Sequence, residues 1–342
     1  MGLFTVLTTA FNAVIPIVLM ILLGYLLRKG GMMDKNFVKT GNKLVFKIFL
    51  PAMLFINVYD IESFAAIRWD VVLYCIPVIF LIFGLCIATI PLYSRVPERR
   101  GVILQASIRS NTAIIGLTLS STLGGPEAVA VAAILSAFAV PTMNILAVIA
   151  LSLYVDTTGR DKPSIRSILL NVLKNPLIIS IALGLVCLVI RWMQTRFLGD
   201  VVFSLRREGK ILYTCLNNLK SIASPLALVI LGGQFEFGAT KGFLREIIAG
   251  TLLRVVIAPA IAIGGAVLLS AYTPLLNFGI NEYPAIIAQF GTPVAVSSAI
   301  MAGQMGNDEQ LATQLVVWSS IASVFTIFLT VCLLMSCGLL SG

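Results

Sequence analysis

The chain divides into ten apolar stretches that are long enough to cross a lipid bilayer as helices. A helix needs about 20 apolar residues to span the hydrocarbon core of a membrane. The stretches are residues 4–27, 37–58, 71–92, 102–123, 128–153, 176–193, 211–233, 247–271, 284–303 and 313–335. Lipid offers no hydrogen-bonding partners to a backbone, so spanning segments of this kind must be helical. We therefore predict an all-α polytopic membrane protein with ten transmembrane helices.

Composition excludes several classes of protein. Of the 342 residues, 58% are hydrophobic and 11% are charged, which is incompatible with a soluble domain, and the loops leave no room for one. Histidine is absent, which removes His-based metal sites and the usual general base of a Ser-His enzyme. We expect no enzymatic activity, no cofactor and no metal site.

Lysine and arginine in the loops predict the orientation, because these residues are retained on the cytoplasmic side. With both termini outside, the cytoplasmic loops carry thirteen Lys and Arg and the outer loops carry six. Five of those six lie between residues 191 and 210, which weakens the bias without reversing it. The formal charge of +9 is thus a topology signal. The expected partner is a lipid bilayer, and nucleic acid is not expected.

Two of the stretches contain residues that an ordinary spanning helix does not need. Residues 288–298 place glycine, proline and hydroxyl side chains at membrane depth, and residues 110–118 interrupt an earlier stretch in a comparable way. Broken helices free backbone groups that lipid cannot satisfy, so they occur where protein or a water-filled cavity solvates them. One break in each half of the chain predicts a secondary transporter.

The two halves of the chain share an ordered series of motifs. The proline-to-glycine segment 16–24 matches 176–184, the segment around Pro51 resembles that around Pro225, and the two breaks follow at a similar shift. These shifts predict a repeat of five spans, 1–154 and 176–342, joined by a cytoplasmic amphipathic connector, 155–175. An odd number of spans per repeat inverts the second copy relative to the first.

Two arginines and one asparagine lie deep within predicted spans. Arg109 and Arg254 each follow a loop arginine by nine residues, or about 13 Å of helix. Each either presents a bidentate guanidinium to a carboxylate substrate or snorkels to the interface and caps freed carbonyls. Asn144 either hydrogen-bonds the region of the breaks or makes a helix–helix contact. A half-helix that begins at a break also directs its positive dipole end toward the cavity, which favours an anion.

The sequence resembles the auxin efflux carrier family. Asn111 to Thr118 is similar to the fourth-span pattern of that family, and Phe49 to Ala52 is similar to its second-span signature. Pro293 and the residues that follow it resemble the ninth-span pattern. The resemblance covers essentially the whole chain. Two positions depart from the family pattern: Thr118 replaces a proline, and Ser297 stands near a common asparagine.

The resemblance implies a fold and a site. It implies a five-plus-five inverted repeat in which the broken helices of spans 4 and 9 cross, with spans 1, 2, 6 and 7 as scaffold and spans 3–5 and 8–10 as a moving transport domain. Substrate in this family lies beside that crossing. Together with the polar residues within the spans, the candidate substrate-binding residues are Arg109, Asn111, Thr112, Gly116, Asn144, Arg254, Gly291, Thr292, Pro293 and Ser297.

The resulting hypothesis is a secondary active transporter of a small organic anion that works by alternating access. The expected anion is a dicarboxylate such as malonate or malate, or an auxin-like monocarboxylate. The coupling ion, proton or sodium, stays open, as does a homodimer through the scaffold spans. A bacterial inner membrane is the expected location. The alternative is a membrane ligand sensor with a transporter-like fold, which would bind its ligand without moving it.

Overall fold

The computed structural model describes residues 3–60, 68–154, 166, 170, 173–273, 276 and 278–340. The predicted connector, 155–175, lies almost entirely outside these residues. The described residues are helical, and no strand occurs among them beyond one isolated bridge. The helices are α1 Leu3–Lys29, α2 Lys35–Leu44, α3 Leu50–Tyr59, α4 Trp69–Thr89, α5 Pro97–Ile108, α6 Leu117–Leu153, α8 Pro176–Leu198, α9 Lys210–Gln234, α10 Leu244–Leu252, α11 Ala258–Tyr272, α12 Glu282–Phe290, α13 Ser297–Gln304 and α14 Glu309–Ser336.

Seven helical segments of the described chain are long and apolar enough to cross a membrane. They are Lys35–Tyr59, Trp69–Leu92, Leu119–Leu153, Pro176–Leu198, Lys210–Gln234, Thr240–Tyr272 and Glu309–Ser336. Each coincides with one of the predicted spans, so the all-helical, multi-span prediction is confirmed. Of the other three predicted spans, 4–27 lies within α1, while 102–123 and 284–303 contain the interruptions. The ten-span arrangement as a whole stays a prediction.

Short π-helical turns join several of the helices into longer rods. Val45–Phe49 connects α2 to α3, Thr112–Gly116 leads into α6, and Leu253–Ile257 connects α10 to α11. A π turn widens the helix locally and frequently marks a functional site. Within α6, Gly125 has a φ of 67°, so α6 is two helices joined at a kink.

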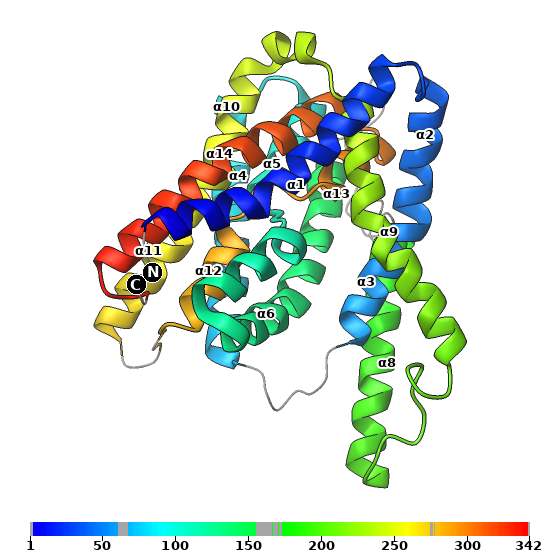
Figure 1. The fold of residues 1–342 in the computed structure, drawn as a ribbon, viewed down its shortest axis with the longest axis vertical. Helices are drawn as coiled ribbons and strands as arrows, with labels where there is room; N and C mark the ends of the chain where they lie inside the picture. Colours follow the sequence, from blue (N-terminus) through cyan, green and yellow to red (C-terminus); the bar gives the residue numbers. More distant parts are fainter. Residues whose placement is uncertain are drawn as a thin grey trace.

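The helices pack into two groups (Figure 1). The helices α1, α2, α3, α8 and α9 contact one another, and they correspond to the spans predicted as scaffold. The other helices, α4 to α6 and α10 to α14, surround the two interruptions. In Figure 1, α3, α8 and α9 run side by side at the right, while α6, α11 and α12 lie to the left. The helix α14 contacts α1 and so joins the two groups.

Two glycines at matching positions of the shared proline-to-glycine segments allow close helix packing. A Cβ atom on Gly24 of α1 would lie 2.0 Å from the carbonyl oxygen of Val229 in α9. A Cβ atom on Gly184 of α8 would lie 2.9 Å from Cβ of Val58 in α3. Backbones this close tolerate no side chain between them, as at other small-residue contacts between membrane helices. The shared proline-to-glycine motif therefore has the same packing role in both halves.

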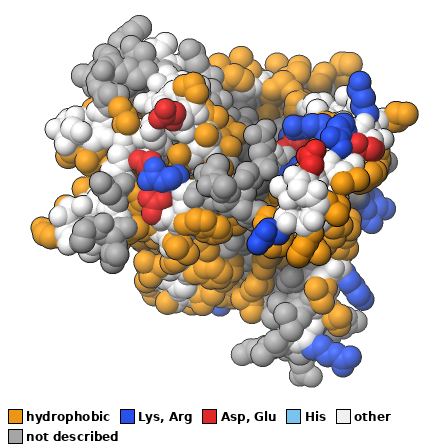
Figure 2. Space-filling model, turned by 90° about the horizontal axis from the view of Figure 1, so that it is seen from below, with side chains coloured by type: hydrophobic (Ala, Val, Ile, Leu, Met, Phe, Trp, Pro, Cys, Tyr) orange, Lys and Arg blue, Asp and Glu red, His pale blue; other side chains and the backbone are white. Residues whose placement is uncertain are grey.

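Ion pairs occur near the ends of the spans. Arg68, before α4, pairs with Asp70 at 2.7 Å and with Glu282 at the start of α12. Arg99, in the first turn of α5, pairs with Glu246 of α10 and with Asp308, both at 3.1 Å. Figure 2 views the molecule from below and shows hydrophobic side chains over much of the surface, with charged side chains gathered in clusters. This distribution is the one expected where a spanning segment meets water.

Candidate functional site

The two interrupted helices meet at their interruptions. The first interruption, Arg109 to Asn111, separates α5 from the π turn before α6, and the second, Gly291 to Val296, separates α12 from α13. The backbone N–H of Asn111 donates to the carbonyl oxygen of Pro293 at 2.9 Å, and that of Ala295 donates to Arg109 at 3.1 Å. Ser110 and Val294 form the antiparallel bridge between them. The freed backbone groups thus satisfy one another, as membrane depth requires.

Arg254 donates to further carbonyl groups at both interrupted helices. Its side chain is fully buried, and its Nε donates to the carbonyl oxygen of Thr292 at 2.9 Å. Nη2 donates to the carbonyl oxygen of Gln289 at 3.0 Å, and Nη1 to those of Ser107 and Ile108 at 3.3 and 3.4 Å. The carboxyl ends of α5 and α12 carry the negative ends of their helix dipoles. One guanidinium therefore neutralises and caps both helix ends.

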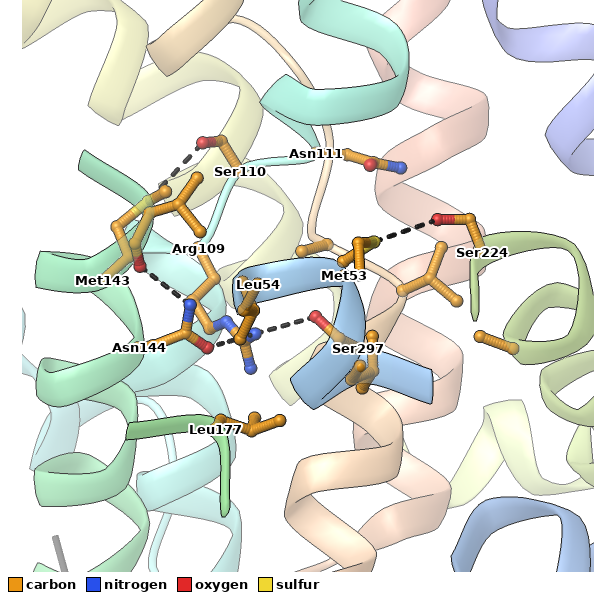
Figure 3. A pocket seen from close by; sticks show the side chains of 15 residues that line it. Met53, Leu54, Arg109, Ser110, Asn111, Met143, Asn144, Leu177, Ser224 and Ser297 are labelled. Carbon is orange, nitrogen blue, oxygen red and sulfur yellow. Dashed lines mark hydrogen bonds between the residues drawn. The ribbon is translucent and has the colours of Figure 1, made fainter. Parts of the chain in front are cut away.

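A cavity of about 60 Å³ lies beside the paired interruptions (Figure 3). This volume holds a few water molecules. The lining residues come from both interruptions, from α6, and from α3, α8 and α9. They are Leu50, Met53, Leu54, Arg109, Ser110, Asn111, Val140, Met143, Asn144, Leu177, Ser224, Ala227, Ala295, Val296 and Ser297. The cavity therefore lies between the two groups of helices.

Arg109 is the charged residue of this lining. Its Nη2 donates to Asn144 Oδ1 at 3.0 Å and to Ser297 Oγ at 2.7 Å, and its Nη1 lies 3.0 Å from the sulfur of Met301. Figure 3 shows the guanidinium reaching between Asn144 and Ser297. In the part of the chain that the structure describes, no carboxylate pairs with it, although the residue is only 4% exposed. A buried cation with neutral partners makes the cavity favourable for an anion.

Asn111 adds an unused donor to the same lining. The residue is buried, and its Nδ2 has no hydrogen-bond partner among the described residues. Buried amide nitrogens are almost always paired, and an unpaired one costs about 1–3 kcal/mol. Asn111 and Arg109 thus supply the lining with a free donor and a positive charge.

Comparison with known proteins identifies the family. A family model described as membrane transport protein matches residues 9–331. The chain belongs to this family, that of the auxin efflux carriers. An uncharacterized transporter of Methanothermobacter thermautotrophicus is 26% identical over 327 residues, which cover 92% of this chain and 95% of the relative. The protein is therefore a multi-pass membrane protein of a transporter family. Membership of such a family suggests that the protein is not an enzyme.

Four of the ten predicted site residues of this transporter line the cavity. Arg109, Asn111, Asn144 and Ser297 do so together. Asn144 corresponds to the first alternative considered for it, because it accepts from Arg109 at the first interruption, while its Nδ2 donates to the Val140 carbonyl of its own helix at 2.8 Å. The structure thus brings residues from three separate segments of the sequence to one small volume.

The other predicted residues form the crossing itself and do not line the cavity. The hydroxyl of Thr112 donates to Gln289 Oε1 at 3.1 Å, and that of Thr292 donates to the Ala288 carbonyl of α12 at 2.9 Å. The Pro293 carbonyl accepts from the first interruption.

Two predicted glycines and one arginine also hold the crossing together. A Cβ atom on Gly116 would meet Ala288 at 2.9 Å, and one on Gly291 would meet the Ile287 carbonyl at 2.9 Å. The guanidinium donors of Arg254 all go to backbone carbonyls. In this conformation Arg254 corresponds to the capping alternative, and the geometry does not support contact between Arg254 and a substrate.

Sequence reasoning missed the apolar wall of the cavity. Leu50, Met53 and Leu54 flank Pro51, while Ser224 and Ala227 flank Pro225. These two proline segments are the ones that match between the halves, although they entered only as evidence for a repeat. The recurrence of this motif in α3 and α9 was the signal in the sequence that both segments line the same cavity.

Proposed function

We propose that this transporter is a secondary active carrier of a small organic anion that works by alternating access. The observation that carries the proposal is Arg109, a buried guanidinium that lines the cavity with neutral partners. Together with the unpaired Nδ2 of Asn111, it offers charge and hydrogen bonds that suit one carboxylate group. The apolar wall from α3 and α9 suits the organic part of such an anion. Malonate, malate and auxin-like acids have this character.

The ten-span inverted repeat belongs to this proposal, and the ion pairs at the span ends support it. The start of α4 is joined to the start of α12 through Arg68 and Glu282. The start of α10 is joined to the start of α5 through Glu246 and Arg99. In an inverted repeat α4 corresponds to α10, and α5 to α12, so the two pairs occupy equivalent places with their charges exchanged. The matched packing of Gly24 and Gly184 points the same way.

Alternating access is favoured by where the cavity lies. Its walls come from both groups of helices, so a movement of the group that contains the interruptions against α3, α8 and α9 would change access to Arg109. Since Arg109 and Asn111 belong to one interruption, they would move together with a bound anion. A homodimer, the outward position of both termini and location in a bacterial inner membrane stay predictions.

The test is flux through the purified protein. Radiolabelled malonate and indole-3-acetate are offered to proteoliposomes with and without an imposed pH gradient, and empty liposomes serve as the control. Saturable uptake of either anion is the expected result. Specific binding of an anion without any flux would contradict the proposal and favour the ligand sensor.

A further inference from the structure

A second cavity, of about 570 Å³ and thus larger than the first, also lies between the two helix groups. Residues of α2, α9, α13 and α14 line it, among them Asn42, Gln234, Gly303 and Glu309. Its lining is polar, and in the predicted orientation it opens on the cytoplasmic side. The transport site uses none of these residues.

Glu309, the first residue of α14, is held there by two amides. Its Oε1 accepts from Nδ2 of Asn42 in α2 at 2.7 Å and from Nε2 of Gln234 in α9 at 2.7 Å. Within the described residues, no lysine or arginine forms an ion pair with it. Two neutral donors thus hold a carboxylate, and both come from the helix group opposite to its own.

The side chain of Glu309 packs against Gly303. A Cβ atom on Gly303 of α13 would lie 2.5 Å from Cδ of Glu309, well inside van der Waals contact. The carboxyl group therefore packs directly on the backbone of α13, on the helix that follows the second interruption. A change at Glu309 is transmitted to that helix by contact.

The two amides can serve either protonation state of the carboxyl group. Asn42 is 3% exposed, and both its Oδ1 and Gln234 Oε1 lack hydrogen-bond partners among the described residues. An ionised carboxylate accepts from amide N–H groups, whereas a protonated carboxyl must also donate. Rotation of either amide would offer it one of these unpartnered oxygens. The two amides can therefore hold the carboxyl group both before and after it gains a proton.

Charged groups of both signs face the same cavity. Arg28 from the end of α1 and Lys35 and Lys39 from α2 line it, as do Glu236 after α9 and Asp308 before α14. The three basic residues favour the ionised form of Glu309, while its burial and the two acids favour the protonated form. Asp308 is already paired with Arg99 and caps α14 through the N–H of Leu311. Among the described residues, Glu236 and Glu309 have no cationic partner, and of these two only Glu309 accepts from side-chain amides.

We propose that Glu309 is a proton-binding site that couples anion transport to the pH gradient. A proton from the water of the larger cavity binds one carboxylate oxygen, the charge of that side chain is lost, and an amide rotates to accept the new O–H. The contact of α14 with α2 and α9 is then made by a neutral group, and the proton is released to water on the opposite side of the membrane after the helix groups have moved. This inference rests on the proposed function, since coupling has meaning only for a carrier.

The experiment compares wild-type protein, Glu309→Gln and Glu236→Gln in proteoliposomes. Exchange of radiolabelled malonate at equal pH reports the anion pathway, and accumulation under a pH gradient reports coupling, with an internal pH-sensitive dye to follow proton entry. Glutamine keeps the contacts of the neutral carboxyl group. We expect Glu309→Gln to retain exchange at a reduced rate while accumulation and substrate-dependent proton entry fall at least about tenfold. Glu236→Gln, which removes an acid from the same lining, should behave as wild type.

The outcomes separate this inference from the proposed function. Accumulation or proton entry that persists in Glu309→Gln would overturn the coupling site, and so would a complete loss of exchange, which would indicate a purely structural role. Wild-type flux that ignores the pH gradient, or that follows a sodium gradient, would overturn the inference and leave the carrier intact. Absence of any wild-type exchange, tested with both malonate and indole-3-acetate, would remove the proposed function itself.

Discussion

Arg109 and Arg254 are both buried beside the same paired interruptions, and their partners are of different kinds. Arg254 donates to four backbone carbonyls, those of Ser107, Ile108, Gln289 and Thr292. Arg109 meets side chains, which are neutral and can rotate away. Backbone carbonyls at a helix end have no alternative partner, whereas side chains can exchange a partner for a ligand. Arg254 is therefore built into the fold, whereas Arg109 is available to a ligand.

The two arginines also differ in how the energetic cost of their burial is compensated. Hydrogen bonds to the negative ends of two helices offset the desolvation cost of burying Arg254. Arg109 is 4% exposed and has no charged partner among the described residues, so its positive charge is poorly compensated. An anion bound beside Arg109 would compensate this charge, as the proposed function requires. The following substitutions test whether the two arginines divide the work in this way.

The largest effect is expected for Arg254→Gln. The substitution leaves at least two buried carbonyls without a donor, at about 1–3 kcal/mol each, so the midpoint of thermal unfolding in detergent should fall by about 5 °C or more. Arg254→Lys should also be destabilised, because one ammonium group cannot reach the ends of α5 and α12 together. Unchanged unfolding of both variants would show that Arg254 is not the cap.

Arg109→Gln should have the opposite profile. Loss of two charge-assisted hydrogen bonds to a carboxylate, at about 1.5 kcal/mol each, predicts affinity about 100-fold weaker, while thermal stability is unchanged or rises because a poorly paired charge is removed. Arg109→Lys keeps the charge without the planar fork and should bind with intermediate affinity. Concentration-dependent uptake by proteoliposomes measures both. Equal affinity of Arg109→Lys and wild type would exclude bidentate contact.

Asn111→Ala tests the unused donor. Because Nδ2 has no partner, its removal should cost little stability, and the backbone bond to Pro293 does not depend on the side chain. Loss of one hydrogen bond to a carboxylate predicts affinity about tenfold weaker. The same uptake assay supplies the number, with unfolding measured in parallel. Wild-type uptake by this variant would mean that Asn111 does not contact the anion.

The smallest effect distinguishes the hydroxyl of Ser297, at the start of α13, from that of Thr292 in the second interruption. Ser297 lines the cavity and accepts from Arg109 at 2.7 Å, whereas Thr292 donates to the Ala288 carbonyl of α12. Ser297→Ala should weaken anion affinity by a few-fold, since a neutral partner of the guanidinium is lost, and Thr292→Val should leave affinity as it is. A larger loss of anion affinity in Thr292→Val than in Ser297→Ala would indicate that the anion binds near Thr292 and not near Ser297.

Much of the architecture could be predicted from the sequence, because the membrane constrains it strongly. Apolar runs gave the spans, and the glycine, proline and hydroxyl residues at 110–118 and 288–298 gave the positions of the interruptions. Asp308 caps α14, and an aspartate just before an apolar helical run is a local signal of a helix start. These signals are local, so no knowledge of tertiary contacts was needed.

The roles of the two arginines could not be separated from the sequence. Both follow a loop arginine by nine residues, so both have the same expected depth. The direction in which each side chain points depends on the packing of α10 and α11 against both interruptions and on the π-helical turn that contains Arg254. Sequence periodicity assumes a regular helix and is lost at such a turn.

Glu309 was missed for a related reason. In the sequence it stands beside the helix-capping Asp308 and reads as one more acidic residue in a first turn. Its partners lie 267 residues away at Asn42 and 75 residues away at Gln234. A carboxylate held by amides of two other helices becomes recognisable only when those helices have been assembled around it.

Protection of an introduced cysteine by substrate tests most directly that the cavity beside Arg109 is the anion site. The six native cysteines are replaced, and cysteine is introduced at Ala295 in the cavity lining or at Gln304 in the larger cavity. A water-soluble methanethiosulfonate labels each variant with and without the anion that shows flux. The account predicts that the anion slows labelling of Ala295→Cys and leaves Gln304→Cys unaffected. Protection of Gln304→Cys alone would contradict it.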